Sequence, residues 1–239
     1  MIYAIISDVH ANLEAVTACF QEIDKIKPDK IICLGDLVDY CAEPNEVIEI
    51  IWSRCDIVLL GNHDEAQYDY SIPKWFREYA KTSSKLTRSL LSKDNLEFLK
   101  TLPRLHTENN ILFVHASPKY LPRYKYVLDT DAAYDNFPSF SEHICFIGHS
   151  HRPIIFREGD GFAEIIGPEQ VTSEGKYIIN VGSVGQPRDG NPKLAFGLFN
   201  SETYAYQQYR VDYDITTASE KISKLPLPSS LAERLFEGL

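Results

Sequence analysis

The sequence predicts a mixed α/β fold in which two packed, mixed β-sheets are flanked by helices. Five apolar runs of four to six residues, bounded by glycine and polar residues, have the pattern of buried strands. The early runs alternate with amphipathic helical segments, as in parallel strands joined by right-handed crossovers. After residue 151 the pattern changes to short alternating runs separated by Gly, Pro, Asn and Asp, which is typical of antiparallel strands.

The first half of the chain is predicted to alternate strands with helices. After the first strand, Asn12 can cap a helix with one apolar face, and Pro28 breaks this helix before the second strand. Pro44 then begins a second helix, which leads to the third strand. The strands expected in this half are residues 2–7, 30–34, 56–60, 104–107, 110–114 and 144–148.

A helical insertion is expected at about residues 65–102. The side chains expected on its buried side are Trp75, Phe76, Tyr79, Leu86, Leu90 and Leu91. The insertion serves either as a cap beside a site or as packing, and packing is the simpler interpretation. The loop at 116–141 is rich in Pro, Tyr and basic residues, and its place after a strand end suits it to contact a ligand. Its tyrosines are interpreted as packed or solvated residues in preference to a platform for stacked bases: Tyr120, Tyr124 and Tyr126.

The second half is expected to be mostly β-structure with a helical tail. The predicted strands are residues 153–157, 162–166, 169–173, 176–181, 193–199 and 203–210. The tail, at about 212–239, has the pattern of two short helices, the second capped by Ser229 or Ser230. No linker-like, repeated or low-complexity segment interrupts the chain, so residues 1–239 are expected to form a single domain.

Composition excludes several classes of protein. The 34 acidic and 24 basic residues give a formal net charge of −10, which disfavours non-specific binding to nucleic acid or anionic membranes. Bound divalent cations would reverse the field locally, so an anionic substrate is still allowed. No apolar run approaches the roughly 18 residues that span a bilayer. The chain opens on a strand instead of a leader peptide, and its five cysteines form no C-x-x-C pair, so a cytoplasmic location is expected.

The apolar runs share one property: each is followed by a residue that can bind a metal. Ligands of open α/β sheets bind just outside the carboxyl ends of the strands, so these side chains are expected to meet. The residues concerned are Asp8, His10, Asp36, Asn62, His63, Asp64, His115, His149 and His151. Any one of these residues alone is better explained as a turn or capping residue. Five strand ends that all carry such residues together predict a metal site that holds two ions.

The types of donor indicate which metals and which chemistry. Asp8 and His10 can bind one ion, and the two carboxylate oxygens of Asp36 can bridge two. Mixed carboxylate, amide and imidazole donors suit Mn, Fe, Zn, Ni or Co better than Ca or Mg. Two such ions about 3.5–4 Å apart are the arrangement used for in-line displacement at phosphorus.

At this point the sequence resembles a known family. The blocks Asp8-x-His10, Gly35-Asp36, Gly61-Asn62-His63-Asp64, His115 and Gly148-His149-x-His151 are similar, in order and in their glycines, to those of the calcineurin-like metallophosphoesterases. A single block would be weak support, whereas five in order are specific. The wider segments GDLVDY, GNHDEA and NVGSVGQPRDGNP look closest to the small bacterial and archaeal phosphodiesterases of that family.

The resemblance implies a sandwich of two mixed sheets and a site with two divalent metals. It assigns one ion to Asp8, His10, Asp36 and His151, and the other to Asp36, Asn62, His115 and His149. It makes His63 catalytic, with Asp64 orienting its ring. The expected reaction is the hydrolysis of a phosphoester by a hydroxide that bridges the ions, with His63 protonating the leaving oxygen.

One departure from the family bears on the substrate. The protein phosphatases and dinucleoside-polyphosphate hydrolases of the family usually carry an arginine shortly after the Gly-Asp block, next to the phosphate, but here Leu37-Val38-Asp39-Tyr40 follows. This disfavours a phosphoprotein or polyphosphate substrate. Arg188 could take over the phosphate contact, or it could be a surface arginine of a turn; the two interpretations are equally weighted. Gly182 and Gly185 could cradle an anion, although a turn that needs positive φ explains them at least as well.

These observations predict an enzyme that hydrolyses a small phosphodiester or nucleotide-type phosphoester, with Asn62 and Arg188 contacting it. The alternatives are a phosphoprotein phosphatase on the same site and a catalytically silent scaffold of the same fold. A scaffold would be expected to lack some ligands or the catalytic histidine, and none is missing. His106 and His143 match no block and are not expected in the site. The sequence leaves the oligomeric state open.

Overall fold

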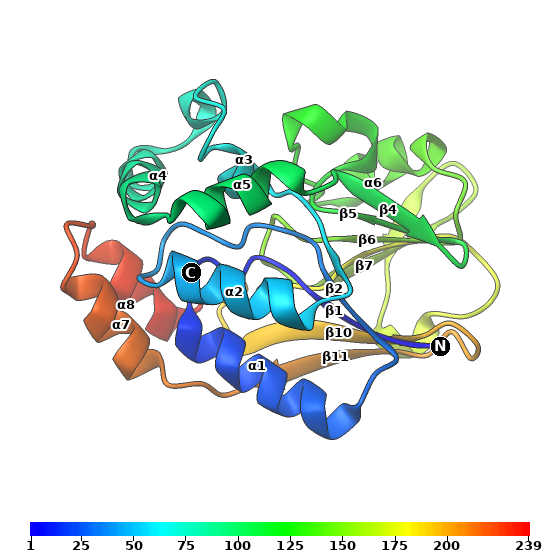
Figure 1. Cartoon of the computed structure of the whole chain (residues 1–239). Helices are drawn as coiled ribbons and strands as arrows, with labels where there is room; N and C mark the ends of the chain where they lie inside the picture. Colours follow the sequence, from blue (N-terminus) through cyan, green and yellow to red (C-terminus); the bar gives the residue numbers. More distant parts are fainter.

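Two mixed β-sheets form the centre of the computed structural model, which describes all 239 residues (Figure 1). The first sheet contains β1 (Ile2–Ile6), β2 (Lys30–Cys33), β3 (Ile57–Val58), β10 (Leu194–Asn200) and β11 (Tyr206–Val211). The second contains β4 (Leu105–Glu108), β5 (Ile111–Val114), β6 (Ile144–Ile147), β7 (Ile154–Glu158), β8 (Ala163–Ile165) and β9 (Tyr177–Asn180). The strand orders are β11-β10-β1-β2-β3 and β4-β5-β6-β9-β7-β8.

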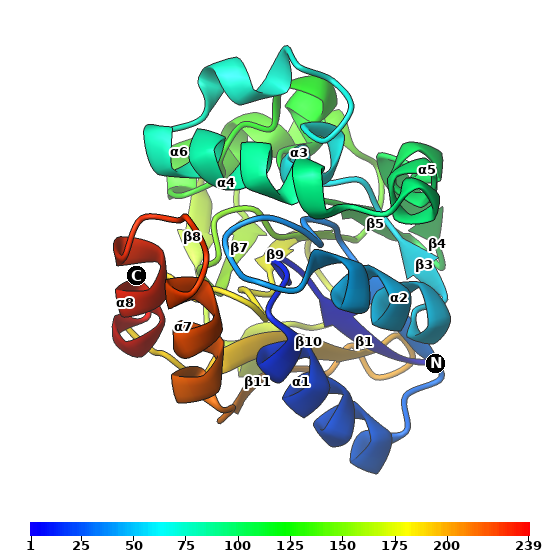
Figure 2. The ribbon, with the colours of Figure 1, turned by 60° about the vertical axis from the view of Figure 1, so that its left-hand side comes forward.

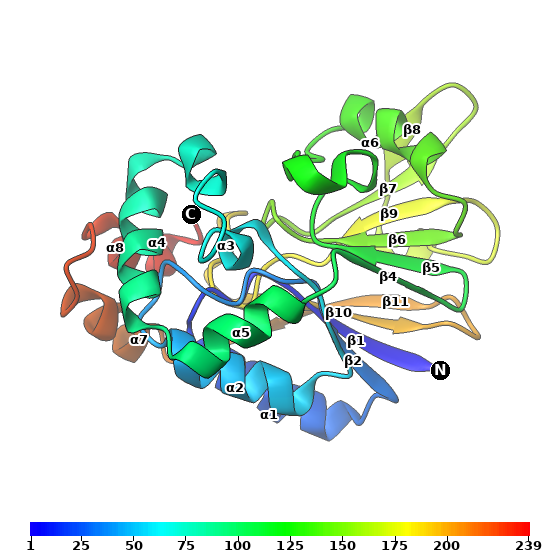
Figure 3. The same cartoon turned by 45° about the horizontal axis from the view of Figure 1, so that its top comes forward.

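Helices cover the outer faces of both sheets. The helices are α1 (Leu13–Ile26), α2 (Pro44–Arg54), α3 (Asn62–Glu65), α4 (Glu78–Leu90), α5 (Lys93–Thr101), α6 (Thr130–Asn136), α7 (Ile215–Ser223) and α8 (Ser230–Glu237). Figure 3 shows α1 and α2 against the first sheet and α6 outside the second. None of the helices is both long and apolar enough to cross a bilayer.

The alternation of side chains along each strand builds the layers of the core. Tyr3 and Ile5 of β1 lie between the two sheets, whereas Ala4 and Ile6 pack in the cluster that contains α1 and α2. The same alternation places Phe146 of β6 between the sheets and its neighbours against α6. Successive residues of a strand point to opposite faces, so each sheet contributes to two apolar layers. The prediction of two packed mixed sheets flanked by helices is confirmed.

Local signals set the first two helices where the sequence predicts them. The Asn12 side chain accepts a hydrogen bond from the Ala15 amide at 3.1 Å and caps α1. Lys27 ends α1 in the left-handed conformation, and its amide bonds to the Ile23 carbonyl. Pro44 occupies the first turn of α2, where its missing N–H removes no helical hydrogen bond.

Two predictions for the second half of the chain are wrong. No strand forms at 169–173; Pro168–Gln170 is a single 3₁₀ turn. Pro168 has no N–H to give to a sheet, which explains why the apolar residues beyond it do not extend a strand. The strands after residue 151 are also not all antiparallel, because β9 pairs parallel to β6 and antiparallel to β7. Alternation predicts a strand but does not predict the direction of its partner.

The buried side of the helical insertion also differs from the prediction. Trp75 is 87% exposed and Leu90 is 41% exposed. The side chains that α4 buries are small or polar: Ala80, Ser83, Ser84 and Thr87. Ser83 Oγ accepts a hydrogen bond from the Tyr40 amide at 2.6 Å, so α4 approaches the loop after β2 closely. Small hydroxyl side chains permit this contact, and large apolar ones would prevent it.

The C-terminal helices pack against the same region. Residues of α7 and α8 form an apolar cluster with Tyr40 and with Ala80 of α4. Figure 2 shows α7 and α8 side by side at one flank of the molecule, below the insertion. The tail therefore joins the loop after β2 to the insertion.

Candidate metal centre

The predicted ligands lie on strained turns just after their strands. Five of them have left-handed backbones, with φ of 54° at Asp8, 50° at His10, 56° at Asp36, 66° at His149 and 59° at His151. Residues other than glycine rarely adopt positive φ, and such strain concentrates at functional sites. The turns aim these side chains away from the sheets and into one buried space, where all five are at most 7% exposed.

Main-chain hydrogen bonds hold the turns together. The amides of Val9 and His10 both donate to the Asp36 carbonyl, at 2.9 and 3.0 Å. Glycine is required where two turns touch. A Cβ on Gly61 would come within 2.1 Å of Asp36 Oδ1, and one on Gly148 within 1.9 Å of Ser7 Oγ. The motif glycines therefore allow the ligand-bearing turns to approach one another.

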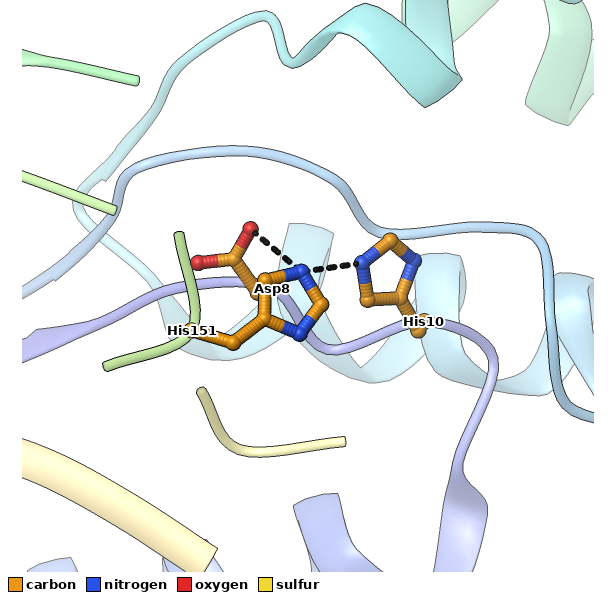
Figure 4. A group of neighbouring side chains, drawn as sticks. All are labelled: Asp8, His10 and His151. Atoms are coloured by element: carbon orange, nitrogen blue, oxygen red, sulfur yellow. Dashed lines mark hydrogen bonds and ion pairs between the residues drawn. The ribbon is translucent and has the colours of Figure 1, made fainter. Parts of the chain in front are cut away.

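One group of donors consists of Asp8, His10 and His151 (Figure 4). The Nε2 atoms of His10 and His151 are 3.2 Å apart, and His151 Nε2 is 3.4 Å from Asp8 Oδ1. All three donor atoms lie within 4.8 Å of one another. The arrangement brings together the ends of β1 and β6, which belong to different sheets.

A second group consists of Asp36, His115 and His149. His115 Nε2 is 3.1 Å from Asp36 Oδ2 and 3.2 Å from Asn62 Oδ1. Asp36 Oδ2 also lies 3.8 Å from His10 Nε2, so this carboxylate faces both groups. The structure therefore brings together all seven side chains predicted as ligands.

The hydrogen bonds of the imidazoles test whether a cation fits. His10 Nδ1 lies 2.8 Å from the Val38 carbonyl, and His151 Nδ1 lies 2.5 Å from the Gln186 carbonyl. A carbonyl only accepts, so each Nδ1 carries the proton and each Nε2 presents a lone pair. The two lone pairs face each other, and His149 Nε2 is buried with no partner. A cation in the first donor group would satisfy the lone pairs of His10 and His151, and one in the second group would satisfy that of His149, so the residues fit metals.

Burial and the neighbouring carboxylates shift the pKa values of the donor residues in opposite directions. Burial lowers the pKa of His149 to about 3 and holds the pKa values of His10 and His151 well below their ordinary value, so these rings are neutral at pH 7. Burial raises the pKa of Asp8 to about 7. At His115 burial opposes protonation, but the Asp36 and Asp8 carboxylates outweigh it and raise the pKa to about 9.

The predicted contact between Asp64 and the His63 ring is wrong. The partner of His63 is Asp39, whose Oδ2 lies 2.6 Å from His63 Nδ1. The Asp64 carboxylate instead accepts from three main-chain amides, those of Asp36 and Leu37 at 2.8 Å and Gly61 at 3.0 Å. Successive residues of a helix point about 100° apart. Because His63 and Asp64 are consecutive residues of α3, their side chains point in different directions. Asp64 joins the two turns that carry Asp36 and Asn62.

Three further residues support the site and were not predicted from the sequence. Tyr40 Oη lies 3.0 Å from His63 Nε2, and Asp39 holds the other side of that ring. Gln186 is fully buried; its carbonyl bonds His151, and its side-chain oxygen accepts from Arg188 Nη2 at 2.8 Å. Of the three, only Asp39 has a signal in the sequence, because it is a charged residue within the apolar run LVDY.

The other residues that the sequence analysis considered have different surroundings. Gly182 and Gly185 do not cradle an anion, because their amides already donate to Asn180 Oδ1 and to the Asp8 carbonyl. His106 and His143 lie outside both donor groups. Tyr124 is tied to Glu65 by a 2.7 Å hydrogen bond. The ring of Tyr126 stacks on His149 with centroids 4.1 Å apart.

A cavity of about 1040 Å³ opens beside the donor groups. Asn62, His63 and His149 line its inner end, together with Arg188. Arg188 is half-buried, and its Cζ lies 5.5 Å from the centre of the Tyr40 ring. The insertion and the loop predicted at 116–141 line the outer part. Arg188 therefore lines the same cavity as Asn62, His63 and His149.

The sandwich and the clustered donors define a calcineurin-like phosphoesterase. The calcineurin-like phosphoesterase superfamily domain matches residues 1–203, and the chain belongs to this family. It is a metal-dependent phosphoester hydrolase.

Three similar proteins cover essentially the whole chain. The uncharacterized protein MJ0912 of Methanocaldococcus jannaschii is 38% identical, over 98% of this chain and 97% of its own length. A metallophosphoesterase from Sphaerobacter thermophilus is 34% identical with a TM-score of 0.87, covering 100% of this chain and 99% of that one. The hypothetical protein PH1004 of Pyrococcus horikoshii shares the fold, with a TM-score of 0.82, 20% identity and coverage of 100% and 98%.

Proposed function

We propose that the protein hydrolyses a phosphodiester or nucleotide-type phosphoester at a centre of two divalent metals. The observation that carries this proposal is the position of Asp36, whose carboxylate faces both buried donor groups. Asp8, His10, Asp36 and His151 would hold one ion, and Asp36, Asn62, His115 and His149 would hold the other. The donor set suits Mn, Fe, Zn, Ni or Co.

The metals, when bound, would lower the pKa of a water and neutralise charge on the phosphoryl oxygens. The protein's own groups supply the rest of the chemistry. His63 is held from both sides by Asp39 and Tyr40 and faces the cavity. Although burial opposes it, the carboxylates of Asp36 and Asp39 raise the pKa of His63 and so favour the protonated form. His63 can then give its proton to the leaving oxygen. Arg188 and Asn62 orient the phosphoryl group.

A hydrolysis screen tests this proposal. The protein is assayed on phosphomonoesters and phosphodiesters with Mn²⁺, Ni²⁺, Co²⁺ or Mg²⁺ after removal of its native metal. We expect metal-dependent turnover, with bis(p-nitrophenyl) phosphate or a nucleotide ester favoured over phosphoserine peptides. A strong preference for phosphopeptides would favour a phosphoprotein phosphatase. No turnover with any ion would favour the catalytically silent scaffold, against which the complete donor set argues.

Two properties of the whole chain complete the proposal. All five cysteines are free and four are buried, which suits a reducing compartment, so we place the enzyme in the cytoplasm. We propose that residues 1–239 form one domain, because the tail shares an apolar cluster with the loop after β2 and with α4.

A further inference from the structure

The outer part of the cavity is lined by basic residues. Six basic residues line it: Arg77, Arg123, Lys125, Arg152, Arg188 and Arg234. No aspartate or glutamate does, although the chain has 34 acidic and only 24 basic residues. None of the six forms an ion pair with a carboxylate side chain, whereas many other lysines and arginines of the chain do, including Lys30, Arg104 and Arg210. Arg234 Nε donates to Leu239 O, and the cavity still gathers six basic side chains that no carboxylate side chain neutralises.

Only Arg188 belongs to the inner end. The others come from segments outside the ligand-bearing turns, except Arg152, which follows His151 directly. Arg77 precedes α4, and Arg234 lies on α8, beyond the part of the chain that the family domain matches. Arg234 Cζ is 5.4 Å from the centre of the Tyr79 ring, and that ring is 6.0 Å from Tyr40. Arg234 is therefore two aromatic rings away from His63, on the outer wall.

Aromatic rings lie between the cations and the metal centre. The Phe76 ring is 4.5 Å from that of His63, and Tyr126 stacks on His149. Trp75 also lines the cavity although it is 87% exposed. Such rings offer flat surfaces to a planar group. The volume of about 1040 Å³ is at the upper end of ligand sites and far exceeds the needs of one phosphate.

We propose that the outer wall, chiefly Arg77 and Arg234, is a second anion subsite. The substrate is then a nucleotide-type phosphoester that carries a phosphate in addition to the one attacked at the metals, with its base on the aromatic rings. This inference rests on the proposed function, because it names the class of substrate for the same site. The family arginine that this chain lacks after Asp36 would contact the phosphate attacked at the metals. Its absence therefore does not bear on a subsite at the outer wall.

Equilibrium binding tests the subsite. The full chain as purified is titrated with AMP, ADP and adenosine 3′,5′-bisphosphate by calorimetry at low temperature, and the ligands are recovered to check that they are intact. We expect at least one of the two ligands with an added phosphate to bind about tenfold tighter than AMP, since a charge-assisted contact is worth about that factor. ADP and the bisphosphate differ in where the added phosphate lies, so the tighter of the two locates the subsite.

Matched variants assign the effect to the wall. In the double variant Arg77→Gln/Arg234→Gln, the ratio of the affinity for the doubly phosphorylated ligand to that for AMP should fall about tenfold. Arg54→Gln is the control: it removes an arginine that does not line the cavity, and the ratio should be unchanged. Equal affinities for all three ligands, or a variant that weakens them equally, would overturn the subsite. Its failure is distinct from failure of the proposed function: hydrolysis without the preference rejects the subsite, whereas the preference without hydrolysis of any phosphoester rejects the function.

Discussion

His63 owes its orientation to contacts that its sequence neighbours do not make. Asp39 and Tyr40 hold its two ring nitrogens, and its main-chain amide donates to Asp36 Oδ1 at 2.8 Å. The order of the five motif blocks was enough to predict which side chains meet. The partner of the ring was not predictable, because a helix directs Asp64 elsewhere and Asp39 reaches His63 only through the fold.

We predict that His63→Ala keeps the metals but loses about 10²–10⁴-fold in turnover of alkyl or nucleotide esters, the usual contribution of a general acid. The loss should be smaller on p-nitrophenyl esters, since nitrophenolate hardly needs a proton to leave. Asp39→Asn should reproduce this pattern more weakly. Steady-state kinetics on both kinds of ester, with metal analysis, measure it. Equal losses on both esters would instead assign His63 to the phosphoryl oxygens.

The position of Asp36 between the two donor groups leads to a prediction about metal content. Asp36→Asn should weaken the binding of both ions, whereas His10→Ala should mainly weaken one, because His10 belongs to a single group. Elemental analysis of protein purified without chelator should find up to two transition ions per chain in the unaltered protein. Stoichiometric binding that survives the combined loss of Asp36, His115 and His149 would refute the assignment.

Gln186 has two separable contacts. Its carbonyl bonds His151 and survives any substitution of the side chain, while its side-chain oxygen accepts from Arg188. Gln186→Leu should therefore raise KM and leave metal content unchanged, and Arg188→Ala should do the same more strongly. If kinetics with Arg188→Ala are unchanged, Arg188 is only a turn residue.

Helix α4 illustrates how an element can differ from its sequence pattern. Its large apolar residues suggested an apolar buried face, yet the buried face is small and polar because it meets the main chain of the loop after β2. The parallel pairing of β9 with β6 has the same origin. Periodicity predicts that an element forms, but its partner depends on segments far away in the sequence.

The contact between Ser83 and the Tyr40 amide can be tested. Ser83→Ala leaves that buried N–H without an acceptor, which should lower the free energy of unfolding by about 1–3 kcal/mol. Because Tyr40 contacts His63, kcat should fall as well. Ser89→Ala, on the exposed side of the same helix, is the matched control. Chemical denaturation measures both variants, and equal stabilities would show that the amide has another partner.

The C-terminal tail packs against the centre of the molecule. The helices α7 and α8 close an apolar cluster over the loop after β2, and Lys221 pairs with Glu14 and Glu43 beside it. The sequence predicted two short helices here but not where they pack, because amphipathic residues do not identify the surface that covers them. The tail connects the outer wall of the cavity to the rest of the structure.

Leu235→Ala should therefore lower the free energy of unfolding by about 2–5 kcal/mol, the range for a buried leucine. Phe236→Ala is the control: this neighbouring side chain is larger but 51% exposed, and its loss should change the free energy little. Thermal or urea unfolding gives both values. A small effect at Leu235 would mean that α8 contributes little to the fold.

The donors of each metal group come from segments that are far apart in the chain. His10 meets His151 across 141 residues, and β1 and β6 belong to different sheets. Contacts between distant segments form late, because closing long loops costs entropy before any contact is gained. We therefore expect the metal centre to assemble only after both sheets have formed and packed together. During refolding, uptake of a transition metal should lag behind the recovery of secondary structure and mark the arrival of the native state.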